Sequence, residues 1–173
     1  SISHAGALRL PAPVFGHAGT GPRADRQEAP HAHSIAPDPS GRWALAADLG
    51  ADKLYIYRLS PSRMEPYGAV QLQPGAGPRH FAFSADGRRL YLANELDSTV
   101  SYLTFDPASA HIEQVQTLSA LPASGASPVS RSQTEPPPNL PHFGFAQMGE
   151  AGGGLENTLA DLHLHPNGRF LYA

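Results

Sequence analysis

The chain repeats itself at an interval of 46 residues, and this periodicity restricts its fold more than any other feature. Three pairs of equivalent residues keep this interval without gaps: Gly41 and Gly87, Asp48 and Asn94, Leu59 and Phe105. Each copy holds four short runs of apolar or alternating residues, separated by turns rich in Gly, Pro and Asp. Four short strands in a unit of this length are typical of a β-propeller blade. We therefore predict an all-β chain built from four-stranded antiparallel blades.

These runs define the strands expected within each copy. The first copy predicts strands at residues 34–35, 43–47, 53–59 and 68–73, and the second at 81–83, 90–93, 99–105 and 112–118. A further strand is predicted at 7–10, and a third copy begins at residue 162 and runs to 172. The run 122–156, rich in Pro, Ser and Gly, separates the second copy from the third. Since proline gives no ladder donor, this run is expected to be a surface insertion, with a substrate lid as the alternative.

The repeat divides the chain into parts of one propeller domain. The parts are 1–30 as the end of a preceding blade and its connection, 31–78 and 79–121 as two blades, 122–156 as the insertion, and 157–173 as the start of the next blade. A propeller closes with about four to eight blades. The 173 residues therefore predict an incomplete ring, with both ends as cuts in a longer chain. An open β-sandwich made from the same strands is the alternative architecture.

The composition excludes several classes of function. A formal net charge of -3 argues against non-specific binding to nucleic acid or to a membrane surface. No apolar run reaches transmembrane length, and no signal peptide is visible. The absence of Cys excludes disulfides, thiol nucleophiles and Cys-ligated zinc. It also suits a reducing compartment, so we expect a cytoplasmic protein.

A hairpin predicted within residues 77–96 brings two charged side chains together. It turns at Asp86 and Gly87, so the start of its first strand and the end of its second meet at one edge of the sheet. Arg79 stands at that start and Glu95 at that end. The two side chains are therefore expected to be neighbours, although sixteen positions separate them.

The repeat adds further residues to this rim of the expected channel. Aligning Pro30–His31 on Pro78–Arg79, with a two-residue insertion at Pro39–Ser40, makes His31 the equivalent of Arg79. Ala160–Asp161 then takes the same place in the third copy. Seven polar residues are expected on one face of the channel: His31, His33, Asp48, Arg79, His80, Glu95 and Asp161.

The chemistry of these side chains suggests specific roles. Arg79 suits a bidentate cradle for a carboxylate or phosphate, and an ion pair between blades, to Glu95 or Asp161, is the alternative. Glu95 would act as a general base or orient a water, unless it merely neutralises Arg79. His31 and His33, two positions apart, would act in proton transfer, bind a metal, or bond across the channel. Because no third ligand lies at a diagnostic spacing, no metal is predicted.

The remaining candidates are assigned by residue type. His33, His80 and Asp161 are candidates for contact with substrate, although the residue pattern favours a packing or loop role for His80. Asx side chains at strand ends bond the nearby backbone, so Asp48, Asp86 and Asn94 are expected to cap turns and strands. Five aromatic residues are expected in the blade core: Trp43, Phe81, Phe83, Tyr91 and Phe170.

Four segments in this order resemble the lactonase-family seven-bladed propellers: 26–34, 48–52, 75–80 and 94–96, with 157–172 similar to the family's next blade start. The family includes 6-phosphogluconolactonase and the fungal enzyme that cyclises 3-carboxy-cis,cis-muconate. The resemblance implies a rim site of His31, Arg79 and Glu95, and a further Arg that would follow residue 173. It implies hydrolysis of a small anionic lactone, such as 6-phosphogluconolactone, without an organic cofactor.

Two other functions stay open. A carboxymuconate cyclase would use the same groups to assist the addition of a carboxylate to a double bond. A non-catalytic propeller that serves as a binding platform also fits the repeat and requires no special role for Glu95.

Overall fold

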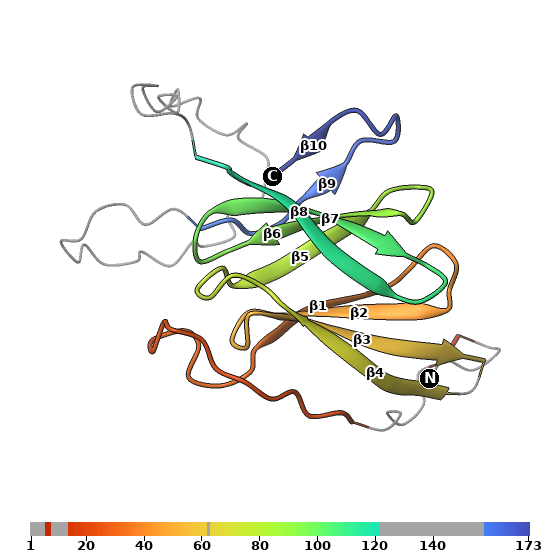
Figure 1. Ribbon diagram of the computed structural model, residues 1–173, viewed down its shortest axis with the longest axis horizontal. Helices are drawn as coiled ribbons and strands as arrows, with labels where there is room; N and C mark the ends of the chain where they lie inside the picture. The colour runs from red at the N-terminus through yellow and green to blue at the C-terminus, as the bar shows by residue number, and fades with distance from the viewer. Residues whose placement is uncertain (1–5, 8–13, 62, 122–157) are drawn as a thin grey trace, which may run out of the picture.

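A computed structural model of the chain describes residues 6–7, 14–61, 63–121 and 158–173. The secondary structure of these residues consists of ten strands in three antiparallel sheets (Figure 1). The prediction of an all-β chain with four-stranded antiparallel repeats is confirmed. No helix of membrane-spanning length and hydropathy occurs in the described part of the chain. Residues 8–10 of the predicted strand at 7–10, and the insertion at 122–156, fall outside the described residues.

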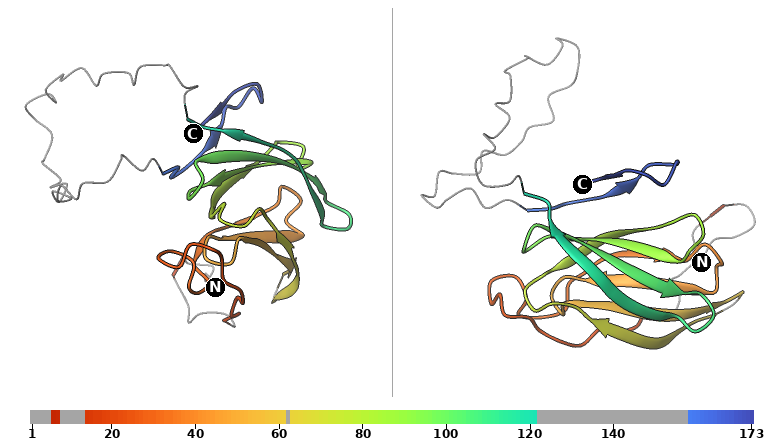
Figure 2. Two further views of the ribbon diagram at one scale, coloured as in Figure 1. Left: turned by 60° about the vertical axis from the view of Figure 1, so that its left-hand side comes forward. Right: turned by 45° about the horizontal axis from the view of Figure 1, so that its top comes forward.

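Each complete repeat forms one four-stranded sheet in chain order. The first sheet consists of β1 (Ala32–Pro37), β2 (Trp43–Asp48), β3 (Lys53–Ser60) and β4 (Arg63–Gln71). The second consists of β5 (Pro78–Phe83), β6 (Arg89–Asn94), β7 (Thr99–Asp106) and β8 (His111–Ser119). The third copy contributes a short hairpin of β9 (His163–Leu164) and β10 (Leu171–Tyr172). The three sheets lie side by side in chain order, with the second in the middle (Figure 2).

The predicted bounds of β4 are wrong by several residues. The strand was expected at 68–73 but begins at Arg63, directly after the turn in which Ser60 pairs with Arg63. Pro66 and Gly68 interrupt the apolar pattern there, yet both are accommodated because β4 is the outer strand of its sheet. An edge strand tolerates proline, whose missing N–H faces no partner.

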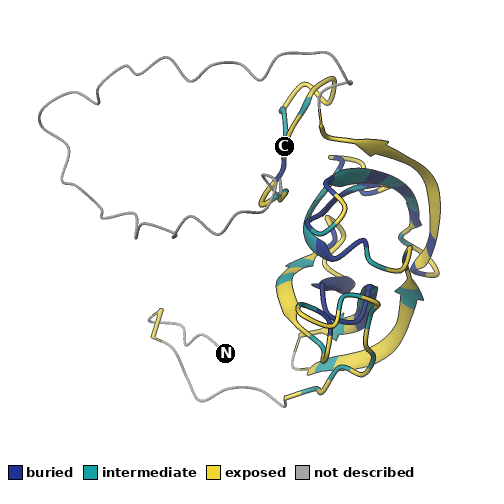
Figure 3. Ribbon diagram, turned by 90° about the vertical axis from the view of Figure 1, so that its left-hand side faces the viewer, coloured by how far each residue is buried: buried dark blue, intermediate teal, exposed yellow. Residues whose placement is uncertain are grey.

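The main core lies between the first two sheets. Five leucines at its centre have no exposed surface: Leu45, Leu54, Leu90, Leu92 and Leu103. Figure 3 shows the buried residues concentrated inside the two sheets and the exposed ones on the outer strands. Trp43 belongs to this core and joins the sheets through a 3.0 Å hydrogen bond from its Nε1 to the carbonyl oxygen of Pro107.

The aromatic residues expected in the core do not all lie there. Phe81 and Phe83 pack against the core, and Tyr91 is half-buried and lies 5.7 Å from Tyr102, between ring centroids. Phe170 is 54% exposed, so its assignment to the core is wrong. It precedes β10 in a hairpin of two strands, and within the described residues its ring meets His165 rather than a sheet.

The hydrogen-bonded registers correct the alignment of the two copies. Pro37 pairs with Ala44 as Phe83 pairs with Leu90, and Leu49 N donates to His31 O as Glu95 N donates to Gly77 O. The offset of 46 thus extends through the first strand without an insertion. His31 is therefore equivalent to Gly77, and His33 to Arg79.

The expected insertion at Pro39–Ser40 is consequently wrong. The two copies differ in length elsewhere: the second is longer by two residues in the connection from β7 to β8, where Asp106 pairs with His111 while Ser60 pairs with Arg63 in the first sheet. The alignment of the third copy, the hairpin of β9 and β10, also needs correction. Its turn bond from Gly168 N to His165 O corresponds to that from Gly87 N to Ser84 O. Counting back from the turn, Asp161 corresponds to His80 and not to Arg79.

The first strand of each four-stranded sheet, β1 or β5, is called its inner strand, and both inner strands contain a bulge at the equivalent place. Between Ala32 and Ser34, β1 advances by two residues while β2 advances by one. Between Pro78 and Phe81, β5 advances by three residues while β6 advances by two. One extra residue thus interrupts the alternation of side chains in each strand. These bulges were not predicted from the sequence, and they determine which side chains turn toward the rim.

Candidate functional site

A nearly buried carboxylate, that of Glu95, lies between two arginines. Glu95 follows β6 directly, and its side chain is 10% exposed. Arg26 Nη2 donates a hydrogen bond of 2.6 Å to Oε1. Arg79 Nε lies 2.7 Å from the other oxygen, Oε2. The prediction that Arg79 and Glu95 are neighbours is confirmed, and the structure adds Arg26 as a third member of this Arg26–Glu95–Arg79 cluster.

Arg79 also contacts both neighbouring inner strands. Ser34 Oγ in β1 donates to the carbonyl oxygen of Arg79 at 2.5 Å, and Arg79 Nη1 donates to the carbonyl oxygen of Ala160 just before β9. The buried Nε–H of Arg79 makes no aligned hydrogen bond, so its link to Glu95 is an ion pair. This pair lies within one hairpin, which differs from the inter-blade pair considered as an alternative.

The loop that leads into Arg79 is fixed by a buried aspartate. Asp52, in the turn between β2 and β3, is 1% exposed. Its two carboxylate oxygens accept hydrogen bonds from Gly75 N at 2.7 Å and Gly77 N at 2.8 Å. Gly77 O in turn accepts from Glu95 N, and Ala76 O accepts from Leu96 N. The backbone on both sides of the Arg79–Glu95 pair is therefore held by one network.

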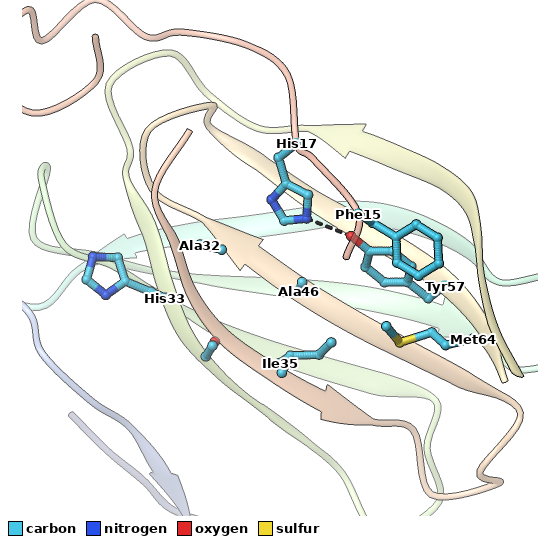
Figure 4. A pocket seen from close by; sticks show the side chains of 9 residues that line it. Phe15, His17, Ala32, His33, Ile35, Ala46, Tyr57 and Met64 are labelled. Carbon is cyan, nitrogen blue, oxygen red and sulfur yellow. Dashed lines mark hydrogen bonds between the residues drawn. The ribbon is translucent and has the colours of Figure 1, made fainter. Parts of the chain in front are cut away.

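His33 lies in the electrostatic environment of this cluster. Partial burial lowers the pKa of His33 from its ordinary value of 6.5, and Arg79 lowers it further, while Glu95 acts in the opposite direction. A neutral imidazole can accept a proton at neutral pH. Figure 4 shows the His33 ring on the opposite side of β1 from Ile35, which is the consequence of the bulge.

His80 and Asp161 join the second sheet to the third hairpin. His80 Nδ1 lies 2.7 Å from Asp161 Oδ1, and His163 Nε2 lies 3.3 Å from Asp161 Oδ2. The hydrogen bond with His80 lowers the pKa of Asp161 below its ordinary value of 3.8. In the described residues, no group of three or more His, Cys, Asp or Glu side chains is arranged to hold a metal ion.

His31 lies apart from the arginine cluster in its described contacts. Its ring Nε2 is 3.6 Å from Glu28, and the side chain is 43% exposed. Its backbone N–H donates to Asp48 Oδ1 at 2.8 Å. Of the three residues implied by the resemblance, the structure therefore joins Arg79 to Glu95 directly, while the His31 ring pairs with Glu28.

Asp48 caps the strand end as predicted, and it also binds a histidine that the sequence did not indicate. Its Oδ1 accepts from His31 N and from Ala51 N, and its Oδ2 lies 2.5 Å from His17 Nδ1. The other nitrogen of His17 lies 2.7 Å from the hydroxyl of Tyr57. His17 forms part of the wall of a pocket of about 280 Å³, together with apolar side chains that include Phe15 and Met64 (Figure 4).

Of the other two predicted caps, Asp86 bonds its turn backbone as expected, whereas Asn94 bonds side-chain hydroxyls of β7 instead of its nearby backbone. Asp86 accepts a hydrogen bond from Arg88 N at 3.0 Å. Asn94 donates to the hydroxyls of Thr99 and Ser101, each at 2.9 Å, and so links β6 to β7.

Sequence reasoning missed Arg26 and His17 for one reason. Both belong to residues 14–28, which lie outside the two copies of the repeat, so no equivalent position could assign them a place. This segment packs on the first sheet through Phe15, against the face opposite the main core.

Two four-stranded antiparallel sheets and a hairpin, side by side in chain order, correspond to part of a β-propeller. The whole chain, residues 1–173, matches the family model described as "Lactonase, 7-bladed beta-propeller", and the chain belongs to this family.

Several known proteins are similar to this chain. The 6-phosphogluconolactonase of Bacillus subtilis (strain 168) is 36% identical over 121 residues, which are 70% of this chain and 34% of that protein. The 6-phosphogluconolactonase of Pectobacterium carotovorum (strain PC1) is 35% identical over 81% of this chain and 35% of that protein. The solved periplasmic gluconolactonase of Pseudomonas aeruginosa has a TM-score of 0.64 and 35% identity, covering 71% of this chain and 35% of that structure. The chain thus spans about a third of the length of these relatives.

Proposed function

We propose that the protein is a lactonase that hydrolyses a small anionic lactone, such as 6-phosphogluconolactone, at the Arg26–Glu95–Arg79 cluster. One observation carries this proposal: two guanidiniums surround a single, nearly buried carboxylate. The cluster therefore has one net positive charge at a rim that is partly shielded from water. Such a site attracts an anion and favours negative charge that develops during a reaction. The names of the relatives support the choice of a lactone.

The chemistry follows from the groups present. A water oxygen adds to the lactone carbonyl carbon while a base removes one of its protons, and the carbonyl oxygen becomes an oxyanion. The ring C–O bond then breaks, and the ring oxygen takes a proton and leaves as a hydroxyl, which gives a hydroxy acid. Arg79 binds the phosphate or carboxylate of the substrate, because guanidinium suits planar or tetrahedral oxyanions.

Glu95 orients the attacking water in this scheme. Each carboxylate oxygen has two acceptor positions; Arg26 uses one on Oε1, and Arg79 contacts Oε2 only as an ion pair. The remaining positions accept a hydrogen bond from water. Proton transfer falls to a histidine. The lowered pKa of His33 favours it as the base, whereas the family resemblance implies His31.

The test is lactone hydrolysis by the full-length protein, with 6-phosphogluconolactone and the uncharged gluconolactone as substrates. We expect Arg79→Gln to raise KM for the phosphorylated lactone at least tenfold and Glu95→Gln to lower kcat by about 100-fold. Arg63→Gln is the matched control, because Arg63 pairs with Glu65 on the outer strand β4. No hydrolysis of either lactone by the wild-type protein would overturn the proposal and favour a binding platform.

Two further outcomes separate the finer alternatives. Cyclisation of a carboxymuconate without lactone hydrolysis would replace hydrolase by cyclase. Equal specificity constants for the charged and uncharged lactones would remove the anionic group from the substrate class. The predicted cytoplasmic location, which rests on the absence of Cys, is tested by cell fractionation.

A further inference from the structure

We propose that Arg26 is a positioning residue of the site, which holds the Glu95 carboxylate in the orientation needed to direct the attacking water. This role rests on the proposed lactonase function. This role gives a function to residues 14–28, a segment that lies outside the blade repeat.

The contact between Arg26 and Glu95 is short and charged. Arg26 Nη2 donates to Glu95 Oε1 at 2.6 Å, across 69 positions of sequence. Hydrogen bonds between ionised groups of this length are about twice as strong as neutral ones. The Glu95 side chain is 10% exposed and that of Arg26 is 37% exposed, so water screens the contact only in part. The pair is therefore able to fix a side-chain orientation.

Arg26 is itself presented by an ordered turn. The next residue, Gln27, is fully buried and donates from Nε2 to Leu49 O at 2.8 Å. Gln27 Oε1 accepts from Arg23 N, and Gly21 N donates to Gln27 O at 3.0 Å. Leu49 follows β2, so this turn is bonded directly to the first sheet. Arg26 thus extends from a fixed backbone toward the second sheet.

One arginine would leave the orientation of Glu95 undefined. Arg79 meets Oε2 through an Nε–H that is not aligned with the oxygen, so this contact attracts the carboxylate without fixing its plane. The aligned hydrogen bond is the one from Arg26 to Oε1. Two contacts on different oxygens define the carboxylate plane, and with it the direction of the free lone pairs. Misplacing a catalytic group by about 1 Å can cost about 100-fold in rate.

The charge balance gives Arg26 a second effect. With Arg26, the cluster has one net positive charge, and without it Glu95 would offset the charge of Arg79 completely. A lysine at position 26 would keep the charge but would not reproduce the geometry of the guanidinium. The lysine variant therefore separates charge from orientation.

The experiment compares Arg26→Gln, Arg26→Lys and the control Arg63→Gln in the full-length protein. We expect Arg26→Gln to lower kcat by about 100-fold and to raise KM for the anionic lactone, because the cluster loses its net charge, and Arg26→Lys to restore KM but only part of kcat. The midpoint of thermal unfolding should match that of Arg63→Gln, because the Arg26 side chain is partly exposed and its turn is held by Gln27.

Three results would overturn this role. A kcat for Arg26→Gln within twofold of an active wild type would show that Glu95 needs no second arginine. A loss of kcat that accompanies a lower unfolding midpoint than that of Arg63→Gln would assign Arg26 a merely structural part. An inactive wild-type protein would overturn the lactonase proposal itself, and the role of Arg26 with it.

Discussion

Asp52 of the first sheet holds the backbone of Gly77, two positions before Arg79 of the second sheet, through a hydrogen bond of 2.8 Å. The same carboxylate holds Gly75 N at 2.7 Å and is 1% exposed. The position of Arg79 therefore depends on a residue of the preceding sheet. The Arg79–Glu95 pair, which lies on one hairpin, is thus held in place partly by the adjacent sheet.

Replacing Asp52 by Ala should destabilise the protein by about 3 kcal/mol, since two hydrogen bonds to a buried charged group are lost and two N–H donors remain without partners. Urea unfolding measures this loss. Asp25→Ala is the control, because Asp25 forms an exposed pair with Arg23, and we expect its urea midpoint to stay close to that of the unaltered protein. Equal values for the two variants would show that Asp52 does not hold the loop.

Gly77 should tolerate no side chain. Its φ of 64° lies in the left-handed region, and a Cβ there would meet Leu96 Cγ at 2.4 Å. We expect Gly77→Ala to cost about 3 kcal/mol by combining backbone strain with overpacking. Gly41 has a similar φ of 69° and nothing within 4 Å of a Cβ, so Gly41→Ala should cost only about 1 kcal/mol. If urea unfolding gives the same decrease in the free energy of unfolding for both variants, the contact with Leu96 does not contribute to the cost.

The charges of the cluster should control the protonation of His33 in opposite directions. Because Arg79 lowers the pKa of His33 and Glu95 raises it, Arg79→Gln should raise this pKa and Glu95→Gln should lower it. NMR titration of the ring measures both shifts, with Arg63→Gln as the unshifted control. A shift of the same sign in both variants would contradict the arrangement described here.

The same pKa sets a dependence of stability on pH. The folded pKa of His33 lies below the unfolded value of 6.5, so between these values the unfolded chain binds more protons. The contribution of His33 to the free energy of unfolding is thus unaffected above pH 6.5. As the pH falls from 6.5 through the folded pKa, stability is lost. His33→Gln should remove this part of the pH dependence.

The sequence predicted the hairpin and its charged pair because local pattern determines both. Two apolar runs predicted the strands of the hairpin, and the Asp86–Gly87 turn predicted their pairing, so Arg79 and Glu95 were expected to meet. The first strand of each copy was harder to place. One extra residue in a bulge alters neither composition nor periodicity visibly. The alignment of His31 with Arg79 failed for another reason, because it assumed a two-residue insertion at Pro39–Ser40, whereas the offset of 46 continues through the first strand.

Arg26 could not be predicted by the same means. Its partner Glu95 is 69 positions away, and no turn or ladder of the sequence connects them. The contact depends on how the turn that contains Gln27 packs on the end of β2, which is a tertiary event. The residues of a site that belong to one sheet can be predicted from the sequence pattern. Residues that another segment contributes cannot.

The matching bulges in β1 and β5 make the side chains at the rim independent of the strand pairing around them. Each supplies a position, His33 in one sheet and Arg79 in the other, where the side chain is released from the in-and-out order of the ladder while the flanking pairs remain in register. A histidine and an arginine thus occupy the equivalent bulge position in successive sheets. Exchanging the residue at one bulge position would change which ligand the rim binds and leave the strand pairing unchanged.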